Sequence, residues 1–349
     1  QVVLLRKQNR LTSRVSGRGV FLNCRNARLL LVYRNPTSLF FYMKPKLILC
    51  VGTGWSATTP LYFTFQENKV STGLQKETHI LAYLQSPFDF TGHMKNRFET
   101  GVYSSEGVRP RTVEEDKLAR VWVTPSLDSY ILFFKHYYNL IKDEYQAVCD
   151  FSTTYAGFTD EIIATFADRL KKEFDVRVIM ILRDPFRRMF SHMSHVNKKN
   201  PLEVLETSYL YLRRFPKDKF QFPLQLNNHR LKNYEPFANS NYALIYKNWS
   251  KHFPTHSIIM EDLWAGRNSE LERLNGFLGA NITKLHENAY YPDKGSNAPH
   301  YKALEDQWSS DTVDLKPEHV ERGRRAMSQY YEEWESLTGV NPWRDDEWV

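Results

Sequence analysis

The stretch that decides the fold runs from Lys46 to Leu61 and reads KLILCVGTGWSATTPL. Its first six residues form a continuous apolar run, which is typical of a strand buried on both faces of a parallel sheet. Two glycines, a serine and three threonines follow within residues 52–59, and Pro60 fits the first turn of a helix. A loop of this kind at a helix N-terminus points backbone N–H groups at an anion. The stretch predicts a phosphate-binding loop at residues 52–59, with an ordinary strand-to-helix turn as the alternative.

Strands and helices alternate through the rest of the chain. Such alternation predicts an α/β fold, in which a parallel sheet carries helices on both faces. Apolar runs predict further strands, and helical spacing of apolar residues predicts the helices between them. The expected strands are 146–151, 176–182 and 257–260, and the expected helices are 160–174, a helix opening at 184–185, 240–253, 269–278 and 317–337.

A second motif follows the strand expected at residues 176–182. Arg183 ends that run, and the residues DPFRRMFS bring Ser191 into the next helix. Ligands bind at the carboxyl ends of strands in α/β folds, so we expect Arg183 at a ligand-binding edge. Its guanidinium offers a rigid fork to a phosphate, and Ser191 can donate a further hydrogen bond. Without the first motif, the same residues also fit a helix cap with solvated arginines.

The first loop lacks the lysine that a nucleotide-hydrolysing P-loop requires. That loop has the pattern GxxxxGK[ST], whereas the corresponding residues 54–59 contain no Lys. Magnesium-dependent ATP hydrolysis is therefore disfavoured, and a P-loop kinase is a distant alternative. The three cysteines are far apart and form no CxxC pair, and no cluster has the spacing of metal ligands. The sequence predicts no metal site.

Together the two motifs resemble those of the sulfotransferases that use 3′-phosphoadenosine-5′-phosphosulfate (PAPS). Their first loop reads roughly GxxKSGTTxL, from which residues 52–61 depart at Trp55 and Ala57. Their second signature reads roughly RDPxxRxxS, and residues 183–191 match it fully. The resemblance implies a P-loop-like parallel sheet and covers about residues 46–345. Stretches that resemble the heparan-sulfate-type branch are 76–79, 242–249, 253–254, 274–279, 294–296 and 330–339.

The resemblance also implies which residues bind PAPS and its product PAP. Arg183 and Ser191 would hold the 3′-phosphate, and Lys294, Gly295 and Ser296 stand where the family closes a loop over the nucleotide. No metal is implied. The residues implied for the 5′-phosphosulfate are those of the first loop: Gly52, Thr53, Gly54, Trp55, Ser56, Ala57, Thr58 and Thr59.

Three neighbouring residues are the catalytic candidates. Sulfuryl transfer, like phosphoryl transfer, is an in-line displacement that depends on positioning and charge, and the acceptor must lose a proton to a base. Glu77 stands where the heparan-sulfate-type branch has its catalytic glutamate, and His79 is the rival base. Lys76 is the nearest candidate cation for the bridging oxygen, because Trp55 replaces the Lys or Arg that the family carries in its first loop.

Two functions follow from these residues. The first is transfer of a sulfuryl group from PAPS to a hydroxyl or amine, and the alternative is a PAP- or PAPS-binding protein that has lost catalysis because of Trp55. The sequence does not name the acceptor: a glycan, a lipid headgroup and a small metabolite all remain open.

The net charge of +7 is concentrated at the N-terminus. No Asp or Glu precedes Glu67, and residues 1–46 contain ten Lys and Arg, so the rest of the chain is close to neutral. A nucleic-acid-binding domain carries its basic residues on the folded body, and we therefore expect no nucleic-acid partner.

Residues 1–42 are expected to lie outside the fold. They are rich in Arg and free of acidic residues, which fits a transit peptide, while Met43 followed by a strand fits an upstream extension equally well. Residues 43–349 are predicted to form a single sulfotransferase-like α/β domain. No stretch reaches the roughly 20 apolar residues of a membrane span. We expect a cytoplasmic protein, with organelle targeting through the basic segment as the alternative.

Overall fold

The computed structural model describes residues 44–74, 76–84, 126–197, 239–265, 268–286 and 317–343, and three strands nearer the N-terminus. Its contacts divide the chain into two units, Gln1–Met43 and Lys44–Val349. The first unit contains an antiparallel sheet, which the sequence analysis did not anticipate. Its strands lie in the order β1 (Val15–Ser16), β2 (Gly19–Cys24) and β3 (Ala27–Val32).

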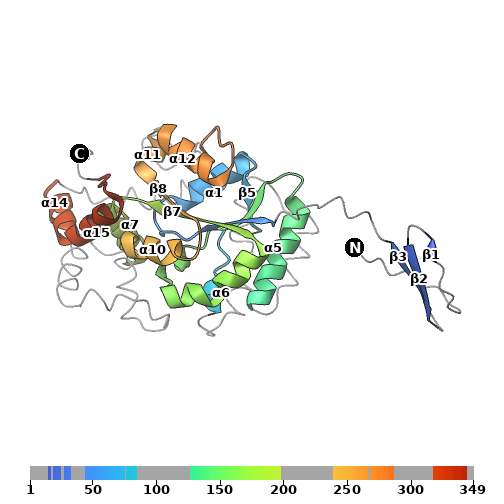
Figure 1. Ribbon diagram of the computed structural model, residues 1–349. Coiled ribbons are helices and arrows are strands. Elements are labelled where there is room, and N and C mark those ends of the chain that lie inside the picture. Colours follow the sequence, from blue (N-terminus) through green and yellow to red (C-terminus); the bar gives the residue numbers. More distant parts are fainter. Residues whose placement is uncertain are drawn as a thin grey trace. The chain divides into compact units, whose positions relative to one another are not determined.

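The second unit is built on a five-stranded sheet in which every pair of neighbours is parallel (Figure 1). The strand order is β5-β6-β4-β7-β8, so the first strand of this unit lies in the middle of the sheet. The α/β fold expected from the sequence is therefore confirmed. The strands are β4 (Lys46–Cys50), β5 (Ser71–Thr72), β6 (Ala147–Asp150), β7 (Asp175–Leu182) and β8 (Thr255–Ile259).

Helices cover both faces of this sheet (Figure 1). One face carries α1 (Thr58–Glu67), α11 (Met260–Trp264) and α12 (Asn268–Leu278), and the other carries α5 (Leu127–Ile141), α6 (Asp160–Glu173) and α10 (Tyr242–Ser250). Side chains of β4 alternate between two separate apolar cores. Leu47 and Leu49 enter the core with α5 and α6, whereas Ile48 and Cys50 enter the core with α1 and α12. This alternation explains why the strand is apolar from Leu47 to Cys50.

Two sequence-based boundaries need correction. The predicted strand 257–260 is β8, which begins at Thr255 and ends before Met260 opens α11. The prediction of a single helix at 317–337 is wrong. The segment forms two helices, α14 (Pro317–Ala326) and α15 (Ser328–Thr338).

The two C-terminal helices share Asp184 and Phe186, which Tyr331 OH of α15 contacts at 3.2 and 3.3 Å, and they differ in their other partners. Arg324 of α14 donates to Asp184 at 2.8 Å, and Gly323 lies so close to Phe186 that a Cβ would fall 2.1 Å from its ring. These contacts dock α14 on α7 (Pro185–Asn197). In α15, Trp334 packs instead against Tyr242 of α10.

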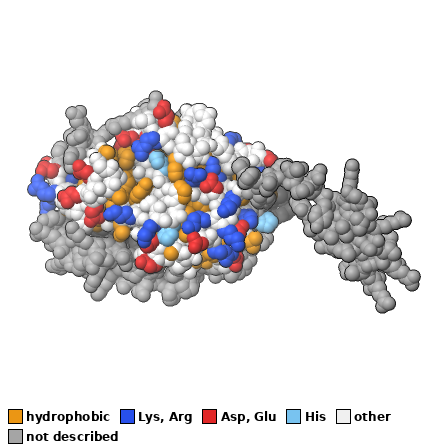
Figure 2. Space-filling view, in the orientation of Figure 1, with side chains coloured by type: hydrophobic (Ala, Val, Ile, Leu, Met, Phe, Trp, Pro, Cys, Tyr) orange, Lys and Arg blue, Asp and Glu red, His pale blue; other side chains and the backbone are white. Residues whose placement is uncertain are grey.

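Charges of both signs mix on the surface. Figure 2 shows Lys and Arg side chains interspersed with Asp and Glu on the visible face of the described residues. The mixing agrees with the near-neutral composition of the chain after residue 46. Within the described ranges, no helix is both long enough and apolar enough to cross a membrane.

A chain that begins at Met43 should fold like the full chain. We expect this because residues 1–43 form a contact unit separate from the five-stranded sheet and its helices. Thermal unfolding followed by circular dichroism should give the same melting temperature for both chains. A large drop in the melting temperature of the shortened chain would show that residues 1–42 stabilise the main unit.

Candidate active site

The two sequence motifs begin side by side in the middle of the sheet. The chain leaves β4 toward β5, on one side of it, and leaves β7 toward β8, on the other, so these two neighbours form the topological switch point where α/β sheets bind ligands. Their pairing continues beyond the strands: Thr53 N donates to Ile181 O at 3.2 Å, and Ile181 N donates to Gly52 O at 2.8 Å.

The first loop has the backbone geometry of a tight turn that enters a helix. Gly52 has a φ of 118°, and a Cβ there would lie 3.2 Å from Thr153 O, so this position requires glycine. Ala57, at φ 59°, precedes α1 and offers no side-chain cap. Pro60 has no N–H, so the donors in the first turn of α1 are the backbone N–H groups that precede it. They include those of Thr58 and Thr59. The N-terminus of α1 therefore has the form of an anion-binding turn.

The second motif holds the first through its arginines. Arg183 Nη1 donates to Trp55 O at 3.3 Å, and Arg188 Nη1 donates to Gly54 O at 3.2 Å. Arg188 is fully buried and also donates through Nε and Nη2 to Ser240 Oγ, at 3.1 and 2.8 Å. Burial lowers the pKa of Arg183, while the nearby Glu261 carboxylate acts in the opposite direction. The loops after β4 and β7 are thus joined into one site.

The structure describes some of the other predicted phosphate-binding residues and not all of them. Ser191 lies in α7 and is half-buried, one residue before His192, whose ring stacks on Trp55 at a centroid distance of 5.5 Å. Thr53 Oγ1 and Ser56 Oγ are 2.9 Å apart and buried. Lys294, Gly295 and Ser296 lie outside the described residues.

The three catalytic candidates form one linked group. Lys76 Nζ lies 2.6 Å from Glu77 Oε1, and His79 Nε2 lies 3.0 Å from Glu77 Oε2, so each carboxylate oxygen faces a different nitrogen. Burial would raise the pKa of Glu77, but the charges and hydrogen bonds of Lys76 and His79 together hold it well below its usual range. Glu77 is therefore ionised at neutral pH and is held on both sides.

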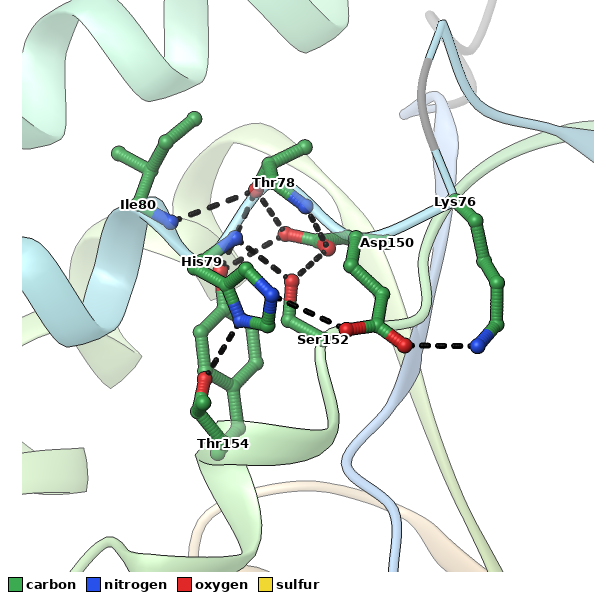
Figure 3. Close-up of polar contacts among 9 residues, drawn as sticks. Lys76, Thr78, His79, Ile80, Asp150, Ser152 and Thr154 are labelled. Carbon is green, nitrogen blue, oxygen red and sulfur yellow. Dashed lines mark hydrogen bonds and ion pairs between the residues drawn. The ribbon is translucent and has the colours of Figure 1, made fainter. Parts of the chain in front are cut away.

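The segment after β6 connects the three catalytic candidates to the first loop. It forms a short 3₁₀ helix, η1 (Thr153–Gly157). Thr154 Oγ1 lies 2.9 Å from His79 Nδ1 (Figure 3). The neighbouring Thr153 packs against the first loop, because a Cβ on Gly54 would meet its side chain at 3.7 Å. The catalytic candidates and the first loop therefore both contact η1.

Sequence reasoning missed several residues of this arrangement. Arg188 had a visible signal, since it is the second arginine of the RDPxxRxxS pattern. Ser240 carried no signal, because it enters the site only through the packing of the segment before α10. Among the described residues, no group of three or more His, Cys, Asp or Glu side chains is arranged to hold a metal ion.

Comparison with known proteins gives only structural likenesses. No family model and no curated protein matches the sequence. A sulfotransferase from Alicyclobacillus acidocaldarius aligns at 16% identity, over 83% of this chain and 94% of its own, with a TM-score of 0.49.

Two further sulfotransferase domains align over similar lengths. The domain from the curacin biosynthetic pathway is 16% identical over 82% of this chain and 97% of its own, with a TM-score of 0.39. The domain from the Synechococcus PCC 7002 olefin synthase is 16% identical over 84% of this chain and 97% of its own, with a TM-score of 0.40. At these identities and TM-scores, the likenesses assign neither an activity nor a ligand to this chain.

Arg188→Met should destabilise the protein measurably. The change removes the guanidinium donors of the partly buried Gly54 O and of the buried Ser240 Oγ, and one unsatisfied buried acceptor costs about 1–3 kcal/mol. Urea unfolding followed by tryptophan fluorescence should show a loss of at least that size. Arg325→Met is the matched control, because the side chain of Arg325 is 79% exposed in its ion pair with Glu321. Equal stability of the two variants would show that Arg188 does not anchor the loop.

Proposed function

We propose that the protein transfers a sulfuryl group from PAPS to a hydroxyl or amine acceptor. The observation that carries the proposal is the meeting of two loops at the switch point of the sheet, with Arg183 and Arg188 reaching the carbonyl oxygens of Trp55 and Gly54. These are the loops whose sequences resemble the 5′-phosphosulfate and 3′-phosphate signatures of PAPS-dependent enzymes. Their proximity supports one nucleotide site made from both.

The residues of the site suit an in-line displacement. The N-terminus of α1 and the hydroxyls of Ser56, Thr58 and Thr59 would hold the phosphosulfate, and Arg183 with Ser191 would hold the 3′-phosphate. The acceptor oxygen or nitrogen attacks sulfur, its bond to sulfur forms as the sulfur–oxygen bond to PAP breaks, and its proton passes to a base. PAP leaves with the electron pair of the broken bond. The donor and the acceptor supply every atom of the two products.

Glu77 is our choice for the base, with His79 as the rival. A carboxylate that two neighbouring nitrogens hold below its usual pKa is ionised and ready to accept a proton, but it is a weak base. Because the Glu77 carboxylate only accepts hydrogen bonds, His79 Nε2 carries a proton in the contact between them. His79 therefore needs its Nδ1 to act as a base, and that atom faces Thr154. This geometry favours Glu77.

A screen of PAPS consumption tests the proposal. The full chain is incubated with PAPS and sets of hydroxyl- and amine-bearing glycans, lipid headgroups and small metabolites, and formation of PAP is measured. We expect acceptor-dependent formation of PAP, and Glu77→Gln should abolish it. PAP binding without turnover on any acceptor class would favour the second candidate, a PAP-binding protein without catalysis.

The inactive protein is kept as a candidate because of Trp55. Its indole stacks on His192, and its N–H is a neutral donor that cannot neutralise a departing oxygen. An active enzyme needs a cation from elsewhere, and Lys76 is the candidate that lies beside the proposed base.

A further inference from the structure

A buried carboxylate at the carboxyl end of β6 collects hydrogen bonds from three parts of the chain. Asp150 is fully buried, and it accepts from Thr78 N at 3.3 Å, Thr78 Oγ1 at 2.6 Å and Ser152 Oγ at 2.5 Å. The hydroxyls of Tyr155 and Tyr130 also donate to it, at 2.8 and 3.1 Å. We call these five residues the Asp150 cluster.

The cluster reaches the catalytic candidates through Ser152 and Thr78 (Figure 3). Ser152 Oγ donates to Asp150 and accepts from His79 N at 2.8 Å, and Thr78 immediately precedes His79 in the chain. Tyr155 OH also accepts from Leu81 N at 3.2 Å. The backbone on both sides of His79 is therefore fixed by groups that Asp150 holds.

His79 needs such support because its backbone is unfavourable. Its φ of 55° lies in the left-handed region, which a residue with a Cβ adopts only when its surroundings hold it there. The side chain depends on this backbone: its Nε2 lies 3.0 Å from Glu77, and its Nδ1 lies 2.9 Å from Thr154. A relaxed backbone at His79 would turn the ring away from both partners.

We propose that Asp150 is a positioning residue, which acts through Ser152 and Thr78 to hold His79 and, through it, the catalytic carboxylate of Glu77. The proposal rests on the proposed function, since Glu77 is the base of that reaction. The cluster is placed to act on His79, because Ser152 bonds the His79 backbone and Thr78 directly precedes it. Asp150 is buried, yet its donors include both hydrogen-bonding groups of Thr78, next to the catalytic candidates.

Two variants separate positioning from stability. Ser152→Ala and Tyr130→Phe each remove one hydrogen bond to the same carboxylate, but only Ser152 also contacts His79. The measurement is the ¹⁵N chemical shifts of the His79 imidazole, which report its tautomer and its hydrogen bonds. Ser152→Ala should move both shifts, because Nδ1 and Nε2 lose their fixed partners. Tyr130→Phe should lower the melting temperature to a similar degree and leave both shifts unchanged.

Kinetics give a second readout of positioning. Ser152→Ala should lower kcat by about 10²-fold, the scale of a 1 Å misplacement in a catalytic site, with PAP affinity unchanged within twofold. Unchanged ¹⁵N shifts in Ser152→Ala, or equal changes in both variants, would overturn the proposal. If Ser152→Ala does not fold, Asp150→Asn, which keeps the shape of the side chain, takes its place with the same expected shifts.

The NMR result is independent of the activity. If the full chain binds no PAP and consumes no PAPS, the proposed function fails, while the ¹⁵N shifts still show whether the cluster positions His79. If PAPS turnover is found and the shifts do not respond to Ser152→Ala, positioning by the cluster fails and the function stands.

Discussion

Lys76→Ala should lower kcat for PAPS-dependent transfer by about 10²–10³-fold and change PAP affinity little. The size follows from the loss of one group that stabilises charge developing in the transition state. Trp55 cannot supply this charge, and Lys76 Nζ lies 2.6 Å from Oε1 of the proposed base, Glu77. The measurement is kcat from initial rates of PAP formation, with PAP affinity from calorimetric titration.

The pH dependence of Lys76→Ala separates two roles of the lysine. Lys76 holds the pKa of Glu77 down, so its removal raises that pKa and moves the acid limb of the kcat profile to higher pH. If Lys76 only tunes Glu77, the rate recovers above that limb. If Lys76 also neutralises the bridging oxygen, the loss persists at every pH, which is the result we expect.

Matched variants complete this test. Lys135→Ala removes a lysine that pairs with Glu173 at 2.8 Å, on helices away from the site, and should leave kcat unchanged. Trp55→Lys, which restores the cation of the family pattern, should be tolerated or activating. If turnover is measurable and Lys76→Ala leaves kcat untouched, Lys76 is not the missing cation, and His79 becomes the better candidate.

Arg183→Ala should weaken PAP binding at least tenfold and spare adenosine 5′-phosphosulfate, which lacks the 3′-phosphate. One charge-assisted hydrogen bond is worth about 1.5–3 kcal/mol, and about 1.4 kcal/mol corresponds to tenfold in affinity. Calorimetric titration of both ligands measures the two losses. Arg177→Ala is the control, because Arg177 lies in β7, the strand that Arg183 follows, but pairs with Asp175 at the opposite end of it.

Arg183 also donates to Trp55 O, which gives the experiment a second possible outcome. If the arginine mainly shapes the first loop, its removal weakens both ligands equally. Equal losses would therefore contradict its role at the 3′-phosphate.

Strands β4, β6, β7 and β8 were predictable because local patterns define them, whereas β5, with only Ser71 and Thr72, is too short to show a pattern. β4 and β7 are apolar at nearly every position, since side chains on both faces enter a core, and α6 has a regular helical spacing. The sequence patterns do not predict helix α5. Its residues 130–141 are rich in aromatics, and the exposed side that carries His136 and Asn139 also carries Leu132 and Leu140, so the polar pattern is interrupted. Its N-cap, Ser126, accepts from Ser129 N.

The site was predictable only where its residues directly follow a strand in the sequence. Gly52 and Arg183 follow their strands directly, so the order of the elements brings them to one edge of the sheet. The Asp150 cluster was not predictable, because Tyr130 is far from Asp150 in the sequence and meets it only through the packing of α5 on β6. The separation of α14 from α15 at Met327 was not predictable either, because the sequence does not show the contact of Gly323 with Phe186.

Calorimetric titration of the full chain with PAP, and separately with ATP, tests the central claim that the two loops form one site for a 3′-phosphorylated nucleotide. PAP should bind at one site per chain, and ATP, which lacks the 3′-phosphate, should bind at least tenfold more weakly. Arg183→Ala should remove most of that difference. Absence of PAP binding, or equal binding of PAP and ATP by the unaltered protein, would contradict the claim.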